Sequence, residues 1–255
     1  MPADAAPSFL YVAELPAAGA TLRLAPEESR YLARVCRARA GERARATDGH
    51  GGLALLRLLD LRGVVTAEVE SVDHQTPGRT AHVLCGAPAA ERGDWLIEKL
   101  AELGVTRFQP VDCTRAAWRH AAGRAARWRR LAVAALRQSQ RRWLMEVAGP
   151  LGLEAALAAL PAGAACWQGD PGGRAAGEVT APRAGVAAGA IGPAGGFEGR
   201  ERALLEKDGF EPLRLSAGRL RTETAALCWA CWWSAASPAG PDQGGPPRSG
   251  GGAGL

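Results

Sequence analysis

The stretch AHVLCGAPAAERGDWLIEKLAELGVTRFQPV, residues 81–111, decides the fold class. It contains an apolar strand, then a helical segment, then a second apolar strand. The middle segment carries apolar side chains at helical spacing, at Leu96, Ile97, Leu100 and Leu103. Gly104 follows where a helix C-cap belongs. Because strands that alternate with helices are typical of a parallel sheet, the stretch predicts an α/β domain.

The same alternation continues toward the C-terminus. A long helix is predicted over residues 125–143, and further strands at Gly185–Ile191 and Pro212–Leu215. A short charged helix ends at Gly209, and a last apolar helix runs from about Thr222 to Ala235. The Pro- and Gly-rich residues 169–183 predict a loose connection in the middle of this domain.

The N-terminal part has a different pattern of short apolar runs separated by turn signals. The turn signals include Asp48-Gly49-His50-Gly51-Gly52, and the runs are Phe9–Val12, Thr21–Leu24, Leu53–Leu59 and Gly63–Val69. This pattern predicts a small, mostly β, barrel-like domain with one short helix at about Glu27–Arg37. We place it at residues 1–73 and the α/β domain at 74–236. Residues 237–255 are nearly all Gly, Pro and small polar residues, which predicts a disordered tail.

Composition excludes several classes of protein. The chain has 255 residues, of which 47% are hydrophobic and 22% charged, so it can bury a core. It contains no run of ~18 apolar residues and no basic region before an apolar run at its start, which argues against a membrane or secreted protein. The scattered cysteines suit a reducing cytoplasm. Cys228 and Cys231 are spaced like a zinc pair but lack partner ligands, so we expect no metal and assign them to helix packing.

Arginine is concentrated in one segment. Between Cys113 and Met145 the chain contains no Asp or Glu but nine arginines, at positions 115, 119, 124, 127, 129, 130, 137, 141 and 142. Such a segment could hold a phosphate backbone while bases rest on guanidinium or aromatic planes. The alternative is a solvated helix face whose tryptophans pack inward. We favour nucleic-acid binding because uncompensated charges repel one another unless an anion is bound, and we expect Trp118, Trp128 and Trp143 to lie in the core.

A glycine loop, Gly192-Pro193-Ala194-Gly195-Gly196, follows a predicted strand and precedes a helix. Open α/β sheets bind ligands at such positions. The loop matches neither the Gly-x-Gly-x-x-Gly nor the Walker pattern, and Pro193 has no N–H to offer a phosphate. A ligand loop and a simple tight turn therefore both stay open.

A polar group of residues, Leu220-Arg221-Thr222-Glu223-Thr224-Ala225, opens the last helix. Thr222 is the predicted N-cap, and Glu223 or Thr224 lies in the first turn, where an oxygen or a negative charge is favourable. Arg221 is not explained by capping, because a positive charge is unfavourable beside a helix N-terminus. Its presence indicates an anion or a reacting group nearby.

Four motifs together resemble one known family. They are EKLAELGVTRFQPV (98–111), RWRRLAVAALRQSQR (127–141), IGPAGGF (191–197) and LSAGRLRTETA (215–225). In order and approximate spacing, over about residues 9–235, they resemble the bacterial 16S ribosomal RNA uridine-N3 methyltransferases of the SPOUT superfamily. Phe9, Ala194 and Ser216 stand where that family usually has Arg, Glu and Gly.

The resemblance implies an architecture and a cofactor. It implies a PUA-like RNA-binding β-barrel followed by a SPOUT α/β domain whose C-terminal part forms a trefoil knot, in a cytoplasmic homodimer. The knot would bind S-adenosylmethionine, largely through backbone groups. The cofactor-binding residues it implies are Ile191, Gly192, Pro193, Gly195, Gly196, Leu215, Ser216, Leu220 and Thr222.

The resemblance also implies a reaction, the methylation of N3 of a uridine in 16S ribosomal RNA of the small subunit. Arg221 would stabilise the anion that forms when N3 loses its proton, and Glu223 would act as a base or an orienting group. The expected phosphate contacts are Arg115, Arg141 and Arg142. Two alternatives stay open: a related SPOUT enzyme that acts on another RNA, and an RNA-binding protein that has lost its catalytic activity.

Overall fold

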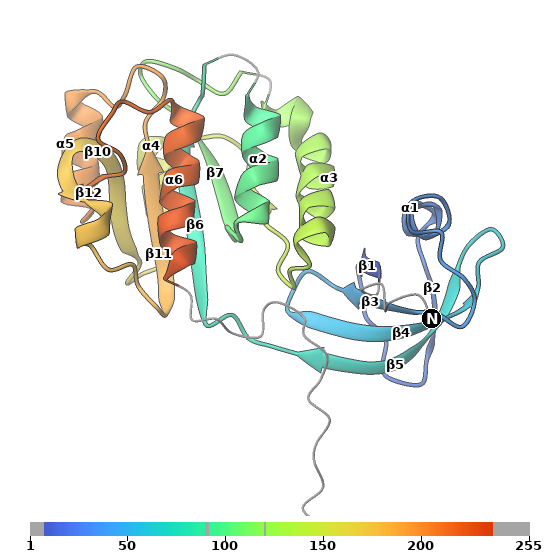
Figure 1. Ribbon diagram of the computed structural model, residues 1–255. Coiled ribbons are helices and arrows are strands. Elements are labelled where there is room, and N and C mark those ends of the chain that lie inside the picture. Colours follow the sequence, from blue (N-terminus) through green and yellow to red (C-terminus); the bar gives the residue numbers. More distant parts are fainter. Residues whose placement is uncertain (1–7, 90–91, 120, 237–255) are drawn as a thin grey trace, which may run out of the picture.

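The computed structural model describes residues 8–89, 92–119 and 121–236, which form two parts that lie side by side (Figure 1). One part contains a five-stranded sheet and the other a seven-stranded sheet covered by helices. The tail predicted at 237–255 lies outside the described residues. No described helix is long and apolar enough to cross a membrane.

The first part is built on a sheet with strand order β1-β3-β4-β5-β2. β1 runs parallel to β3, and the other neighbours are antiparallel. Its core is aliphatic, with Leu10, Leu24, Leu32 and Leu56 fully or almost fully buried. The elements are β1 (Ser8–Tyr11), β2 (Thr21–Arg23), α1 (Pro26–Tyr31), a π-helical turn η1 (Leu32–Cys36), β3 (Arg43–Thr47), β4 (Gly52–Asp60) and β5 (Thr66–His74).

Two features of this part differ from the sequence prediction. The helix expected over Glu27–Arg37 is an α-helix only as far as Tyr31 and continues as η1. Strand β3 was not predicted, because its sequence RARAT contains no large apolar residue. Small side chains are sufficient there, since Ala44 and Ala46 face the core and are completely buried.

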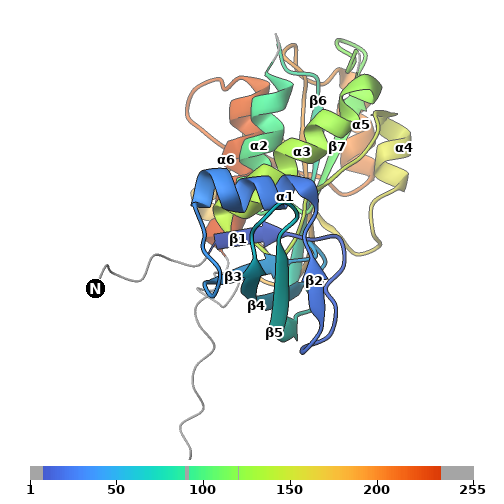
Figure 2. The same ribbon diagram turned by 90° about the vertical axis from the view of Figure 1, so that its right-hand side faces the viewer.

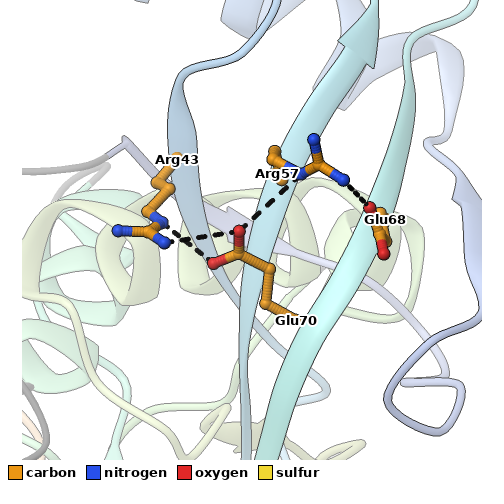
Figure 3. A network of polar contacts seen from close by, with 4 residues as sticks. All are labelled: Arg43, Arg57, Glu68 and Glu70. Atoms are coloured by element: carbon orange, nitrogen blue, oxygen red, sulfur yellow. Dashed lines mark hydrogen bonds and ion pairs between the residues drawn. The ribbon is translucent and has the colours of Figure 1, made fainter.

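The outer face of this sheet carries a cross-strand network of charges (Figure 3). Arg43 on β3 donates to Glu70 on β5 at 2.9 Å, and Arg57 on β4 lies between Glu70 and Glu68. Two arginines and two glutamates thus neutralise one another across three strands.

The second part is a parallel sheet with strand order β12-β10-β11-β6-β7-β8, and β9 also pairs with β7. This confirms the predicted α/β class. The strands are β6 (Arg79–Gly86), β7 (Arg107–Asp112), β8 (Glu146–Val147), β9 (Leu151–Gly152), β10 (Ala165–Ala175), β11 (Gly185–Ile191) and β12 (Glu211–Arg214). The helices are α2 (Gly93–Glu102), α3 (Ala121–Ser139), α4 (Leu153–Ala158), the 3-10 turn η2 (Ala176–Glu178), α5 (Gly199–Lys207) and α6 (Thr222–Ala235).

Helices cover both faces of this sheet. One core contains α2, α3 and α6 with their tryptophans, among them Trp128 and Trp229. The other contains α4 and α5, with Leu157 and Leu205. Figure 1 shows α2, α3 and α6 together on one side. The carboxyl ends of the parallel strands are therefore left open at one edge, where such sheets bind ligands.

Residues 169–175 correct the prediction of a loose connection. They belong to β10, which pairs with β11 over residues 165–168 and with β12 at residues 167–169 and 174–175, with a shift of register between Gly169 and Arg174. The Gly and Pro residues lie in this irregular stretch, where a strand tolerates residues that give no strand signal in the sequence.

The two parts meet along α3 and the residues after it. Arg137 on α3 pairs with Glu28 on α1 at 2.7 Å, and the backbone of residues 142–144 bonds to the turn after β3. In that junction, Thr47 Oγ1 donates to the Arg142 carbonyl at 3.0 Å. Figure 2 shows α1 in front of α3 at this junction.

Candidate active site

The two C-terminal motifs meet at the open edge of the parallel sheet. The glycine loop 192–196 follows the end of β11, and residues 215–221 connect the end of β12 to α6. Thr222 joins them, because its Oγ1 donates a hydrogen bond of 3.0 Å to the Gly192 carbonyl. Two segments that are 30 residues apart in sequence are thus fixed to each other.

The role of Thr222 differs from the predicted one. Helix α6 begins at Thr222, and its N-cap residue is Arg221, whose side chain makes no capping bond. The threonine hydroxyl therefore does not cap the helix. It donates its hydrogen bond to the glycine loop instead.

The glycine loop forms a tight turn. Gly196 donates its N–H to the Pro193 carbonyl at 2.7 Å, and Gly196 has a positive φ of 71° that favours glycine. The neighbouring strand approaches closely, because a Cβ on Gly86 would lie 2.5 Å from Pro193 N. The turn is therefore packed against the end of β6.

A pocket opens between the end of β10 and the second of these segments. It has a volume of about 470 Å³ and is lined by Ala175, Ala176, Gly177, Arg214, Leu215, Ser216 and Ala217. Two of the predicted cofactor residues, Leu215 and Ser216, belong to this wall. Ile191 lies close by, because a Cβ on Gly169 would stand 3.0 Å from Ile191 Cδ1 and 3.4 Å from Leu215 Cδ1. Leu220 is half-buried in the segment that leads to α6.

Arg221 is exposed at the N-terminus of α6. Within the described part of the chain, its guanidinium makes no hydrogen bond or ion pair. The helix dipole does not favour a cation there. The arginine is thus a positive charge at the open edge of the sheet for which the described residues supply no partner.

Glu223 lies in the first turn of the same helix and is 2% exposed. Its Oε1 stands 3.3 Å from Nε of Arg92, the residue before α2. Its Oε2 is buried and makes no hydrogen bond to any described residue. A buried carboxylate oxygen without a partner is costly unless a ligand donates to it. Sequence reasoning missed Arg92, whose only signal is its place before a helix.

The buried thiols at this edge are poor nucleophiles. Burial raises the pKa of the Cys85 thiol, and the nearby Cys113 and Glu223 add to the effect. Burial likewise raises the pKa of Cys113 to about 12, with contributions from Glu201 and Asp112. Both thiols are therefore neutral at pH 7, whereas the nucleophilic form of cysteine is the thiolate.

The tryptophans of the arginine-rich segment lie in the core, as predicted, at two of three positions. Trp118 and Trp128 are 9% and 2% exposed, and each indole N–H has an acceptor, Cys85 O at 2.7 Å and Asp94 Oδ1 at 2.8 Å. Their rings pack edge to face with centroids 5.5 Å apart. Trp143 is half-buried, and its backbone forms an antiparallel β-bridge with His50 at the domain junction.

Most of the nine clustered arginines have partners elsewhere in the fold. The partners come from other elements: Gly195 O and Glu198 for Arg115, Asp94 for Arg127, the Tyr11 hydroxyl for Arg129, Glu28 for Arg137, Glu102 O for Arg141, and Asp73 for Arg142. Arg119 and Arg130 are exposed, and neither has a partner among the described residues. At least four of the nine arginines are thus paired with a carboxylate, at Glu198, Asp94, Glu28 and Asp73.

The three arginines predicted to hold phosphate lie in different surroundings. Arg115 is packed against the glycine loop, Arg141 is folded back onto the end of α2, and Arg142 is 7% exposed at the domain junction. The burial of Arg142 leaves little of its guanidinium to meet RNA. Their contact with phosphate stays a prediction.

Family comparison agrees with this arrangement. The family described as RNA methyltransferase domain matches residues 75–234, more than half of the chain. The chain belongs to this RNA methyltransferase family. A second family, described as RNA methyltransferase PUA domain, matches residues 24–70. The predicted PUA-like domain, α/β domain and family kinship are thereby confirmed, whereas the trefoil knot stays a prediction.

Individual relatives are similar over different shares of their length. Ribosomal RNA small subunit methyltransferase E from Synechocystis is 33% identical over 133 residues, which cover 52% of this chain and 44% of the relative. The match thus spans less than half of that relative. The structure of ribosomal RNA small subunit methyltransferase E from Neisseria gonorrhoeae, bound to S-adenosyl methionine, superposes with a TM-score of 0.81 at 28% identity, covering 91% of this chain and 98% of that one.

A third relative supports the fold alone. A protein from Legionella pneumophila, solved with the cofactor SAM, superposes with a TM-score of 0.78 at 24% identity, covering 91% of this chain and 99% of that one.

Proposed function

We propose that this protein transfers a methyl group from S-adenosylmethionine to N3 of a uridine in 16S ribosomal RNA. The observation that carries the proposal is the bond between Thr222 and Gly192. It brings the glycine loop, the pocket beside Leu215 and the unpartnered Arg221 to one edge of the sheet. The relatives named for small-subunit ribosomal RNA supply the substrate class.

The residues present fit S-adenosylmethionine. The pocket volume of about 470 Å³ lies within the range of roughly 300–1,000 Å³ that is usual for small-molecule sites. Its small side chains and backbone suit a flat ring, and the free Oε2 of Glu223 suits a ligand that donates hydrogen bonds. The residues proposed to hold the cofactor are Ile191, Gly192, Pro193, Gly195, Gly196, Leu215, Ser216, Leu220 and Thr222.

Two side chains would act on the uracil. S-adenosylmethionine supplies the electrophilic methyl group when it is bound. N3 of uracil becomes strongly nucleophilic only as its proton leaves, and negative charge then spreads over the flanking carbonyl oxygens. Arg221, free of other partners, would stabilise that charge. Glu223, held by Arg92, would accept the proton or orient the base.

The RNA would lie over the same edge. The target base must be unpaired or flipped out to present N3. Phosphate contacts were predicted for Arg115, Arg141 and Arg142. We add Arg119 and Arg130, which are exposed and leave their guanidinium groups available.

We propose that residues 1–73 act as the PUA-like RNA-binding unit and 74–236 as the methyltransferase unit of a cytoplasmic homodimer. Helix α6 also carries apolar side chains that are partly exposed to solvent, since Leu227 and Trp232 are only half-buried. On the neighbouring α2, Trp95 is 43% exposed. A second copy would cover this surface. Sedimentation equilibrium tests this, and a monomer at micromolar concentration would contradict it.

Two measurements test the function. Calorimetry on the purified protein is expected to show binding of S-adenosylmethionine, and its absence would favour an RNA-binding protein without catalysis. Mass spectrometry of ribosomal RNA nucleosides from a deletion strain is expected to show loss of one N3-methyluridine. If cofactor binds but a different nucleotide loses its methyl group, the enzyme is a relative that acts on another RNA.

A further inference from the structure

We infer that Arg115 is a positioning residue that fixes the glycine loop, and that its first task is not to hold phosphate. The inference rests on the proposed function, because the loop matters here as the cofactor site. It assigns to Arg115 a role that the arginine-rich sequence does not reveal.

The side chain of Arg115 grips the loop through two contacts. Its Nη1 donates to the Gly195 carbonyl, and its Nε stands 3.4 Å from Glu198 Oε1, the N-cap carboxylate of α5. The guanidinium thus connects the loop to the helix that follows it. An arginine fork suits two acceptors at once, whereas a lysine presents a single point charge.

The stem of Arg115 lies across the backbone of the loop. A Cβ on Gly195 would stand 2.9 Å from Arg115 Cδ and 3.5 Å from Arg115 Cβ. The arginine therefore occupies the space that a side chain at position 195 would take. Such an approach restricts the loop sterically as well as by hydrogen bonding.

Arg115 is itself held in place by its neighbours. Cys113 and Ala116 exchange two backbone hydrogen bonds, of 2.9 and 3.2 Å, which close a tight turn around Arg115. Glu201 accepts the Thr114 N–H at 2.9 Å through Oε1 and the Glu198 N–H at 2.7 Å through Oε2. The turn after β7 and the start of α5 are thus both bound to the Glu201 carboxylate. Arg115, which lies in this turn, connects them to the glycine loop.

The middle of the loop needs such support, although Pro193 is packed against the end of β6. Its one internal hydrogen bond joins Gly196 to Pro193, and at its start Gly192 is held by Thr222. Ala194 and Gly195 are exposed between these points. Glycine-rich backbone loses much conformational freedom when it is ordered. Removing the Arg115 contact should therefore lower the fraction of loops that are competent to bind.

The test is a crossed comparison of Arg115→Ala with Arg119→Ala, a neighbouring exposed arginine. Arg115→Ala is expected to raise the dissociation constant for S-adenosylmethionine about tenfold and to leave RNA affinity within about twofold. Arg119→Ala is expected to weaken RNA binding and to leave the affinity for S-adenosylmethionine within about twofold. Arg115→Lys should fall between wild type and alanine, because it keeps the stem and only one contact.

Hydrogen exchange without cofactor gives a second readout. The amides of residues 194–196 are expected to exchange about tenfold faster in Arg115→Ala, and those of α6 to stay unchanged. Glu198→Gln removes the charge that faces Arg115 Nε, and it should speed exchange of the same amides by less than Arg115→Ala does. This second variant keeps the test valid if Arg115→Ala folds poorly. Unchanged exchange, or a loss of RNA affinity with normal cofactor affinity, would overturn the inference. Failure of wild type to bind the cofactor would instead refute the proposed function.

Discussion

Two arginines of α3, Arg127 and Arg137, differ from Arg221 at the start of α6. The α3 segment is the most basic part of the sequence, yet Arg137 ends on Glu28 and Arg127 on Asp94. Arg221 stands in a sequence that also contains a glutamate, yet it has no partner in the described chain. Charge density along the sequence therefore does not show which arginines lack a partner among the described residues.

The difference has a physical cause. An arginine on a helix that packs against other elements meets their carboxylates, as Arg137 meets Glu28 on α1 and Arg127 meets Asp94 on α2. Burial makes the pair with Glu28 necessary, because that side chain is 6% exposed, whereas Arg127 is 62% exposed. An arginine that replaces a cap at a helix N-terminus gains nothing from the helix. Because the described residues offer Arg221 no partner, it is available to the negative charge of a ligand.

Arg221→Ala is expected to have the largest effect. Removing a donor to a developing anion typically lowers the rate about 10²–10³-fold. Cofactor affinity should change little, since the pocket is lined by other residues. The measurement is methyl transfer to ribosomal RNA under single-turnover conditions, with calorimetry for the cofactor.

Arg219→Ala is the matched control for this experiment, because Arg219 is exposed in the same segment. Equal rates for Arg221→Ala and Arg219→Ala would remove Arg221 from the mechanism. The contrast between free and paired arginines would then lose its functional meaning.

Arg137→Ala should instead reduce stability. It leaves the carboxylate of Glu28, whose side chain is 6% exposed, without its partner at 2.7 Å. The expected loss in the free energy of unfolding is about 2–3 kcal/mol, below the largest values for buried pairs because Arg137 retains some exposure. Urea denaturation measures it. A loss as small as that of an exposed pair would show that the domain junction does not depend on this contact.

Glu28 also makes a pH dependence. Burial raises its pKa above its ordinary value of 4.5, although Arg137 and the Tyr11 N–H oppose the shift. The native state therefore holds this proton more tightly than the unfolded chain, so the contribution of Glu28 is greatest below 4.5 and is lost as the pH rises through the raised pKa. Urea denaturation from pH 4 to 7 should show a smaller decline in Glu28→Gln than in wild type. Parallel curves would contradict the shift.

Regular elements were predictable where local signals were strong. The bounds Gly185–Ile191 of β11 and Thr222–Ala235 of α6 were correct, because each is a long apolar run with clear ends. Strand β3 and residues 169–175 of β10 were missed. Alanines flanked by arginines, or a run of Gly and Pro at a register shift, carry no apolar periodicity.

The site was predictable as motifs but not as contacts. The glycine loop and the Arg221 segment were identified from sequence, whereas the bond from Thr222 to Gly192 and the pair of Glu223 with Arg92 were not. These contacts join segments far apart in the chain. Capping rules assign the Thr222 hydroxyl to its own helix, but in the fold it donates to the Gly192 carbonyl instead.

Arg130→Ala tests whether a free arginine on α3 contacts RNA. It is expected to weaken RNA binding severalfold and to lower the slope of affinity against salt by about 0.7–0.9, the value for one phosphate. Arg127, which pairs with Asp94, is the control on the same helix. Equal salt slopes for Arg127→Ala and Arg130→Ala would break the distinction between paired and free arginines.

The charge network on the outer face of the five-stranded sheet should show the smallest effect (Figure 3). Arg43 is 64% exposed, so water and salt screen its attraction to Glu70. Exposed pairs contribute about 0.2–1 kcal/mol, and Arg43→Ala should lie in that range and approach zero in 0.5 M salt. Urea denaturation at two salt concentrations measures it. Because Arg43 and Arg137 both pair with a glutamate at similar distance, a loss for Arg43→Ala equal to that for Arg137→Ala would mean that burial does not decide what these pairs contribute.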